Sequence, residues 1–151
     1  MTVLSSGYLA TGGLDNMIYV WDTTLITPSN TTTPKYNCTG HTAGISSLTV
    51  SLTGSLISGS FDTHIKIWSS SGTVTSTLLG HTQGVNSLAV LSSGYIVSGS
   101  DDQNVRIWSS GGSSLYNLTS HTSGVNSVAV FSTGYIASGS WDTTLKIWDG
   151  N

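Results

Sequence analysis

Short runs of alternating apolar and polar residues, separated by clusters of Gly, Ser and Asp, follow one another along the chain. Within residues 80–119, the stretches 85–90 and 104–108 alternate, 95–98 is β-branched and aromatic, and 114–119 is a weaker run of the same kind. Runs of this length and period are typical of strands, and the Gly/Ser clusters between them are typical of turns. We therefore expect four antiparallel strands in this stretch and no helix.

The same pattern recurs at a constant spacing along the chain. The recurring histidines are His41, His81 and His121, and a tryptophan occupies the same place after each one, at Trp68, Trp108 and Trp148. Residues 80–110 and 120–150 are identical at 18 of 31 positions. A repeat unit of 40 residues cannot bury its apolar face alone and must stack on its neighbours. We expect one domain, residues 1–151, with repeats at about 1–39, 40–79, 80–119 and 120–151.

The residues at fixed offsets in each repeat resemble those of the WD40 family. The third repeat contains Gly80-His81, then Ser98-Gly99-Ser100-x-Asp102, then Val105-Arg106-Ile107-Trp108, and the Trp-Asp pair itself is present at Trp21-Asp22 and Trp148-Asp149. The resemblance covers essentially the whole chain. It implies an all-β fold in which each repeat is one blade of a β-propeller, giving four WD40-type blades.

The resemblance also implies a buried hydrogen-bond network in each blade, joining a His, a Ser, an Asp and a Trp. The residues at these positions are His41, Ser58, Asp62, Trp68; His81, Ser98, Asp102, Trp108; and His121, Ser138, Asp142, Trp148. Blade one retains Thr11, Asp15 and Trp21 but has no His. Buried polar groups cost several kcal/mol when unpaired and fix a turn when paired, so we assign these residues a structural role.

A hydrolase triad is the competing interpretation of a Ser, a His and an Asp in one repeat. Three equivalent copies argue against it, because an active site normally singles out one constellation, and the chain lacks a Gly-x-Ser-x-Gly nucleophile turn. A zinc site made of the three histidines is rejected because they belong to different blades. We expect no catalytic activity, no metal and no cofactor.

Charge and composition narrow the choice of partners. Charged side chains make up only 7% of the sequence, with four Lys or Arg against seven Asp or Glu, for a net charge of −3. Such a chain offers no basic surface for nucleic acid or for an anionic membrane. No apolar run approaches the roughly 20 residues of a transmembrane helix, and no secretory signal is visible, which slightly favours the cytoplasm. Sequons at Asn30, Asn37 and Asn117 leave secretion open.

Some positions vary while the repeat around them is kept, and these are candidates for a binding surface. The residues before the turn Asp are Leu14, Phe61, Asp101 and Trp141, and those at the entry to the inner strand are Ser46, Asn86 and Asn126. In the family this turn opens on the top face, where many members bind peptides or proteins. Exposed aromatic residues suit interaction hot spots.

Four blades are at the lower limit for a closed ring. Propellers contain roughly four to eight blades, and four wedge-shaped blades of the usual WD40 angle would leave an open arc with two exposed apolar end faces. We expect the chain to be open by itself and to close as a homodimer into an eight-bladed propeller. Residues 144–148 would form an edge strand, because the fourth repeat has no outer strand of its own.

We therefore expect a non-catalytic scaffold that binds a second copy of itself and presents its top face or channel to a protein partner. Two alternatives stay open. Trp and Tyr residues between near-identical blades could bind a sugar or another small ligand. Alternatively, the chain is a piece of a larger propeller, natural or engineered, without a selected partner of its own.

Overall fold

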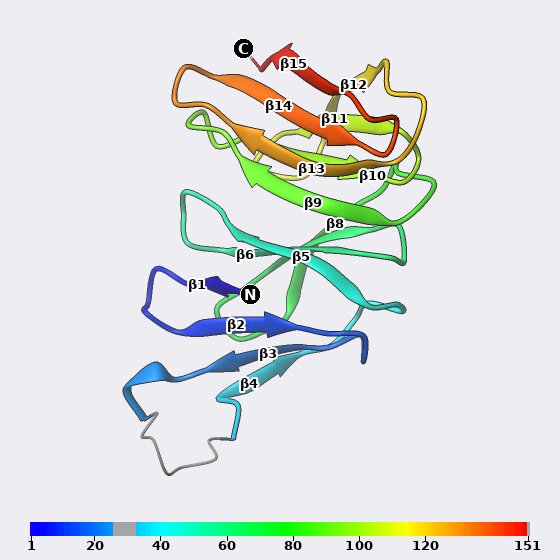
Figure 1. Cartoon of the computed structure of the whole chain (residues 1–151). Coiled ribbons are helices and arrows are strands. Elements are labelled where there is room, and N and C mark those ends of the chain that lie inside the picture. Colours follow the sequence, from blue (N-terminus) through cyan, green and yellow to red (C-terminus); the bar gives the residue numbers. More distant parts are fainter. Residues whose placement is uncertain (26–32, 151) are drawn as a thin grey trace.

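The computed structural model describes residues 1–25 and 33–150 and confirms the all-β prediction. Four antiparallel sheets follow one another along the chain and stack face to face (Figure 1). The first sheet lies at one end of the stack and the fourth at the other. The sequon at Asn30 lies outside the described residues.

In the described part of the chain, each of the first three sheets has four strands and the fourth has three. The first contains β1 (Thr2–Val3), β2 (Leu9–Gly12), β3 (Ile18–Trp21) and β4 (Tyr36–Cys38), with a 3-10 turn at Thr23–Leu25. The second contains β5 (Ile45–Val50), β6 (Leu56–Ser60), β7 (Ile65–Trp68) and β8 (Val74–Leu78). The third contains β9 (Val85–Val90), β10 (Ile96–Ser100), β11 (Asn104–Trp108) and β12 (Ser114–Thr119). The fourth contains β13 (Val125–Val130), β14 (Tyr135–Ser140) and β15 (Leu145–Asp149).

Local sequence determines the hairpins within each sheet. The turn between β9 and β10 closes where the Gly94 N–H donates to the Leu91 carbonyl at 2.8 Å, and Gly94 has a φ of 87°, which glycine adopts without steric cost. The central strand β10 pairs with β9 on one side and β11 on the other, and all five of its residues are buried. A short strand that is buried on both faces therefore lies at the centre of the second and third sheets.

The core lies between sheets rather than within one sheet. At the junction of the second and third sheets, Ile57 and Ile65 from one side pack in one cluster with Val85 and Ile96 from the other. Similar clusters fill the junctions on either side of this one. Backbones approach closely there: a Cβ on Gly59 would lie 2.8 Å from Val85 Cγ1. Each sheet thus has a forward face, toward the next sheet, and a rear face, toward the previous one.

The stack is open at both ends. On the forward face of the fourth sheet, Leu145 is 68% and Ile147 is 54% exposed, whereas the equivalent Val105 and Ile107 in the third sheet are buried. On the rear face of the first sheet, Val3 is 65% exposed. No helix among the described residues is long and apolar enough to cross a lipid bilayer.

Candidate functional site

The four predicted network residues of the third sheet meet at its centre. Trp108 Nε1 donates to Ser98 Oγ at 2.8 Å, and Ser98 Oγ lies 2.7 Å from His81 Nε2. His81 Nδ1 lies 2.8 Å from Asp102 Oδ2, which also accepts the Thr82 backbone N–H at 3.0 Å. Strands β10 and β11 supply the Ser and the Trp, and the turn between these strands supplies the Asp. The network therefore ties the loop before β9 to that turn.

The second and fourth sheets repeat this geometry. In the second, His41 lies 2.7 Å from both Asp62 and Ser58, and Trp68 donates to Ser58 at 2.8 Å. In the fourth, His121 lies 2.7 Å from Asp142 and 2.8 Å from Ser138, and Trp148 donates to Ser138 at 2.8 Å. The structure thus brings all twelve predicted residues together in three sets of four.

A neutral imidazole satisfies every group in this network. Nδ1–H donates to the carboxylate, Nε2 accepts the Ser hydroxyl, and the Ser oxygen accepts the indole N–H. Burial lowers the pKa of His41, although Asp62 opposes this effect. Burial acts to raise the pKa of Asp102, but hydrogen bonds from His81 and from backbone N–H groups outweigh it and lower that pKa to about 2. Hydrogen bonds from Thr144, His121 and backbone N–H groups likewise lower the pKa of Asp142.

The order Ser, His, Asp within each set is that of a hydrolase triad, but the surroundings differ. Ser58 and Ser98 are fully buried, and each Oγ already accepts a Trp N–H. A nucleophilic hydroxyl must reach a carbonyl carbon beside oxyanion-hole donors. A substrate would have to open the sheet to meet either serine.

The first sheet has no histidine, but its Trp and its turn Asp are also hydrogen-bonded. Trp21 Nε1 donates to Thr11 Oγ1 at 2.8 Å, and Asp15 accepts the Tyr19 hydroxyl at 2.8 Å. That hydrogen bond lowers the pKa of Asp15. Tyr19 therefore supplies the turn Asp with the donor that a His supplies elsewhere.

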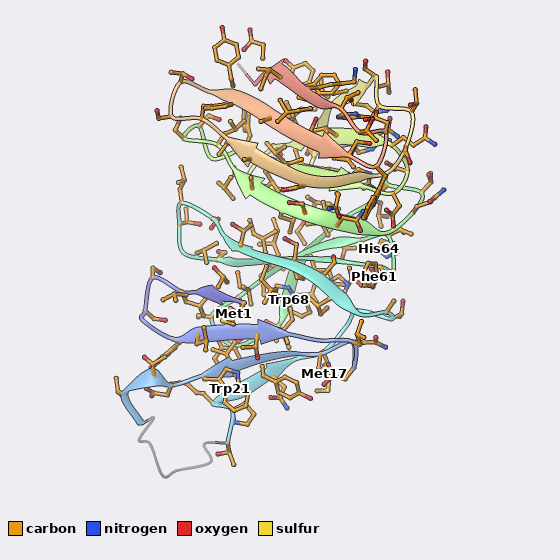
Figure 2. The ribbon with its side chains drawn as sticks, viewed as in Figure 1. Met1, Met17, Trp21, Phe61, His64 and Trp68 are labelled. Atoms are coloured by element: carbon orange, nitrogen blue, oxygen red, sulfur yellow. The ribbon has the colours of Figure 1, made fainter. Side chains whose placement is uncertain are left out.

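The residues before the turn Asp form a row along one side of the stack, which we call the top face. Leu14 lies beside Gly44 of the second sheet, Phe61 beside Gly84 of the third, and Asp101 beside Gly124 of the fourth. Leu14, Phe61 and Trp141 are exposed, and Asp101 is partly buried. Figure 2 shows Phe61 at this side of the second sheet.

The three inner-strand candidates have different surroundings. Ser46 Oγ donates to the Val85 carbonyl of the next sheet, and Asn86 Nδ2 donates to the Val125 carbonyl at 3.1 Å and to Asp101 Oδ1 at 2.6 Å. Their donor groups are therefore engaged in contacts between and within sheets. Asn126 is exposed, beside Trp141 in a hollow of about 410 Å³ on the open forward face of the fourth sheet.

A second cavity lies between the first and second sheets on the side opposite the top face. The sequence left open a small-ligand site between blades but did not indicate which junction holds it. The cavity measures about 270 Å³, and Tyr8, Lys35, Tyr36 and the buried Trp68 are among its lining residues. Lys35 could have been noticed from the sequence, because the aligned positions of the next two repeats are Thr75 and Leu115. Among the described residues, no group of three or more His, Cys, Asp or Glu side chains could hold a metal ion.

Comparison with known proteins agrees with this architecture. A search of curated proteins gives no significant match. The family model described as WD domain, G-beta repeat matches the chain four times, at residues 3–22, 32–69, 72–109 and 112–149. Members of this family typically act as protein-interaction scaffolds. Because the four matches cover most of its length, the chain belongs to the WD40 family.

Proposed function

We propose that this chain is a non-catalytic scaffold that pairs with a second copy of itself to close an eight-bladed ring. The ring would present the top-face row to a protein or peptide partner. The observation that carries the proposal is the relation between the two open faces of the stack.

The exposed faces correspond, position by position, to the two halves of the buried junctions. Leu145 and Ile147 are the equivalents of Ile65 and Ile67, which are buried against the third sheet. At the other end, Val3 is the equivalent of Val90, which packs into that same junction. The forward face of one chain is therefore chemically suited to the rear face of another.

Such a head-to-tail contact either closes into a ring or continues as a filament. Two chains of four blades give eight, within the range of known propellers. Closure would cover both open faces of each chain at once, and this removes a large exposed apolar surface.

Light scattering coupled to size exclusion, over a hundredfold dilution from micromolar concentration, tests this closure. We expect a mass close to twice the 15.7 kDa of one chain. Ile147→Lys places a charge on the forward face and should give a monomer. Leu79→Lys is the matched control, because Leu79 is also exposed but follows the outer strand β8. A monomeric wild-type chain, or a dimer that Ile147→Lys leaves intact, would refute closure by this face.

The top face can be tested separately with a phage-displayed library of random dodecapeptides. Phe61 and Trp141 are large exposed aromatic residues, the kind that dominates binding energy at interfaces. We expect selected peptides to lose at least tenfold in affinity on Phe61→Ser or Trp141→Ser. Tyr135→Ser, in an exposed residue at the opposite end of β14 from Trp141, should leave binding unchanged. Peptides indifferent to both top-face changes would place the binding surface elsewhere.

A further inference from the structure

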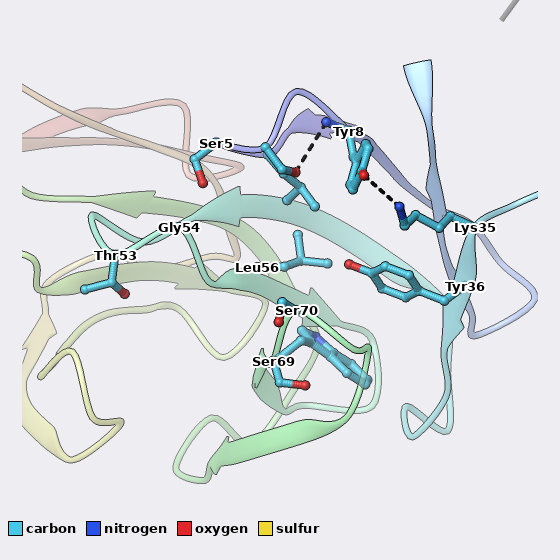
Figure 3. Close-up of a pocket in the computed structure, with 12 residues that line it drawn as sticks. Ser5, Tyr8, Lys35, Tyr36, Thr53, Gly54, Leu56, Ser69 and Ser70 are labelled. Atoms are coloured by element: carbon cyan, nitrogen blue, oxygen red, sulfur yellow. Dashed lines mark hydrogen bonds between the residues drawn. The ribbon is translucent and has the colours of Figure 1, made fainter. Parts of the chain in front are cut away.

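The cavity between the first and second sheets combines three kinds of side chain that converge from separate elements. Tyr8 follows the turn after β1, Lys35 directly precedes β4, Tyr36 begins β4, and Ser69 and Ser70 follow β7. Figure 3 shows these side chains around one hollow. Aromatic rings, hydroxyl groups and one cation therefore face a space of about 270 Å³.

Lys35 gives this cavity its charge. Its ammonium group lies 2.6 Å from the Tyr8 hydroxyl and 4.2 Å from the centre of the Tyr8 ring (Figure 3). Asp22 lies 3.8 Å away and balances part of the charge, but it does not line the cavity. Within the described part of the chain, the cavity lining contains no acidic side chain. An anionic group entering the cavity would meet a cation on this wall and no opposing carboxylate from the described residues.

The two tyrosines shape the remainder of the cavity. Tyr36 is partly buried, and its ring lies against the turn after β7, where a Cβ on Gly72 would come within 2.8 Å of Tyr36 Cδ2. The Tyr36 ring is therefore held in place on the cavity wall. A rigid aromatic face beside hydroxyl groups suits the C–H face and the hydroxyls of a sugar ring.

The other junctions lack this combination. Between the second and third sheets, the positions of Tyr8, Lys35 and Tyr36 are occupied by Ser55, Thr75 and Ser76. Between the third and fourth sheets, the tyrosines recur as Tyr95 and Tyr116, but the lysine position is Leu115. The differences among repeats thus single out one junction with both tyrosines and a cation.

We propose that this cavity binds a hexose-sized sugar acid, with its carboxylate on Lys35 and its ring against Tyr36. The volume is slightly below that of cavities for drug-sized ligands, which fits one sugar ring. The site lies within one chain and does not rest on ring closure.

Isothermal titration of the full chain with D-glucuronate tests the proposal, with D-glucose and acetate as comparators. For a ligand of this size we expect one site per chain and a Kd of about 1 mM. Glucose, which lacks the carboxylate, and acetate, which lacks the ring, should each bind at least about tenfold more weakly. Methyl β-D-glucuronide, titrated in parallel, separates the terminal residue of a glycan from a free monosaccharide: whichever binds more tightly is the natural form.

Variants taken from the chain's own repeats provide the controls. Lys35→Leu introduces the residue that the third repeat has at this position, and it should reduce the affinity for glucuronate to that for glucose. Tyr36→Ser should weaken the binding of both ligands. Thr75→Leu makes the matched change at the next junction and should leave binding unchanged. Lys35 is exposed, so Lys35→Leu should fold normally, which a thermal melt verifies. The proposal would be overturned if the wild-type chain showed no saturable binding at a glucuronate concentration 20 times the expected Kd. It would also be overturned if Lys35→Leu bound glucuronate with wild-type affinity.

Discussion

A hydroxyl group at the centre of each inner sheet connects two aromatic side chains. Ser98 accepts the Trp108 indole N–H and bonds to the His81 ring, and all three side chains are buried. Because each serine bridges two partners that have no access to water, its removal leaves two polar groups unsatisfied. The loss of one buried partner costs about 1–3 kcal/mol.

Ser98→Ala should therefore lower the free energy of unfolding by about 2–4 kcal/mol, measured by urea denaturation. Ser138→Ala removes the same hydroxyl in the fourth sheet, where Trp148 is only partly buried. Water can reach that indole more easily, so a smaller loss is expected. Ser92→Ala, at an exposed turn position, is the control and should change stability by less than about 0.5 kcal/mol. Equal losses for Ser98→Ala and Ser92→Ala would show that the network adds nothing to stability.

The same networks predict that stability falls in acid. The pKa of Asp102 is about 2 in the folded chain, against about 3.9 for an unfolded Asp. Between those two values the unfolded chain binds a proton that the folded chain does not, so stability decreases as the pH falls through this window, by on the order of 2 kcal/mol for this one group. The lowered pKa of His41 acts in the same direction below about pH 6.5.

Thermal melts from pH 8 to pH 2 measure this dependence. Asp102→Asn should be less stable at pH 7 and should show a shallower decline below pH 4. His41→Gln should instead flatten the decline just below pH 6.5. A wild-type melting temperature that stays constant down to pH 3 would contradict the assigned protonation states.

At the scale of elements, close packing between sheets depends on small residues in the second strand of each sheet. A Cβ on Gly99 would lie 2.6 Å from Val125 Cγ1, whereas a Cβ on Gly139 would meet no described atom within 4 Å. Both glycines occupy the same position in their repeats. They therefore form a matched pair that differs in the presence of a following sheet.

Gly99→Ala should destabilise the chain by about 1–3 kcal/mol, because β10 and β13 would have to separate. Gly139→Ala should change the stability of one chain by less than about 0.5 kcal/mol. Differential scanning calorimetry of both variants at low protein concentration measures these values. Similar effects at the two positions would mean that the sheets are not as tightly stacked as described.

The strands were predictable from the sequence because their pattern repeats, and the hydrogen-bond networks were expected because the repeats resemble those of the WD40 family. Period-two alternation indicated β9 and β11 at their observed positions, and the weaker run at 114–119 coincides with β12. The β-branched and aromatic run at 95–98 indicated β10 with a shift of one or two residues. The sequence left open a small-ligand site between blades, but it did not locate the cavity beside Tyr36. This cavity depends on side chains from the first and second sheets whose proximity results from stacking, and neither sheet shows it by itself. The bonds of Ser46 and Asn86 to the next sheet were missed for the same reason.

At the scale of the whole molecule, the proposed ring closure would make stability depend on association between chains. A chain that closes a ring with a second copy gains stability from each contact it buries, and the gain depends on concentration as for any bound ligand. The four sheets of one chain pack against one another at three internal junctions. Ring closure would add one more junction per chain, because two closing contacts are shared between two chains.

We therefore expect the melting temperature of the wild-type chain to rise with protein concentration. A protein concentration one hundred times the dimer Kd adds about 2.7 kcal/mol of stabilisation by mass action. This raises the melting temperature of a domain of this size by several degrees. Ile147→Lys changes only the forward face, which takes part in the closing junction. This variant should therefore melt at a lower temperature that does not change with protein concentration. Scanning calorimetry between 2 and 200 μM makes the comparison, with Leu79→Lys as the control that should follow the wild type. A concentration-independent wild-type melt, equal to that of Ile147→Lys, would mean that the exposed faces of this chain do not associate with each other.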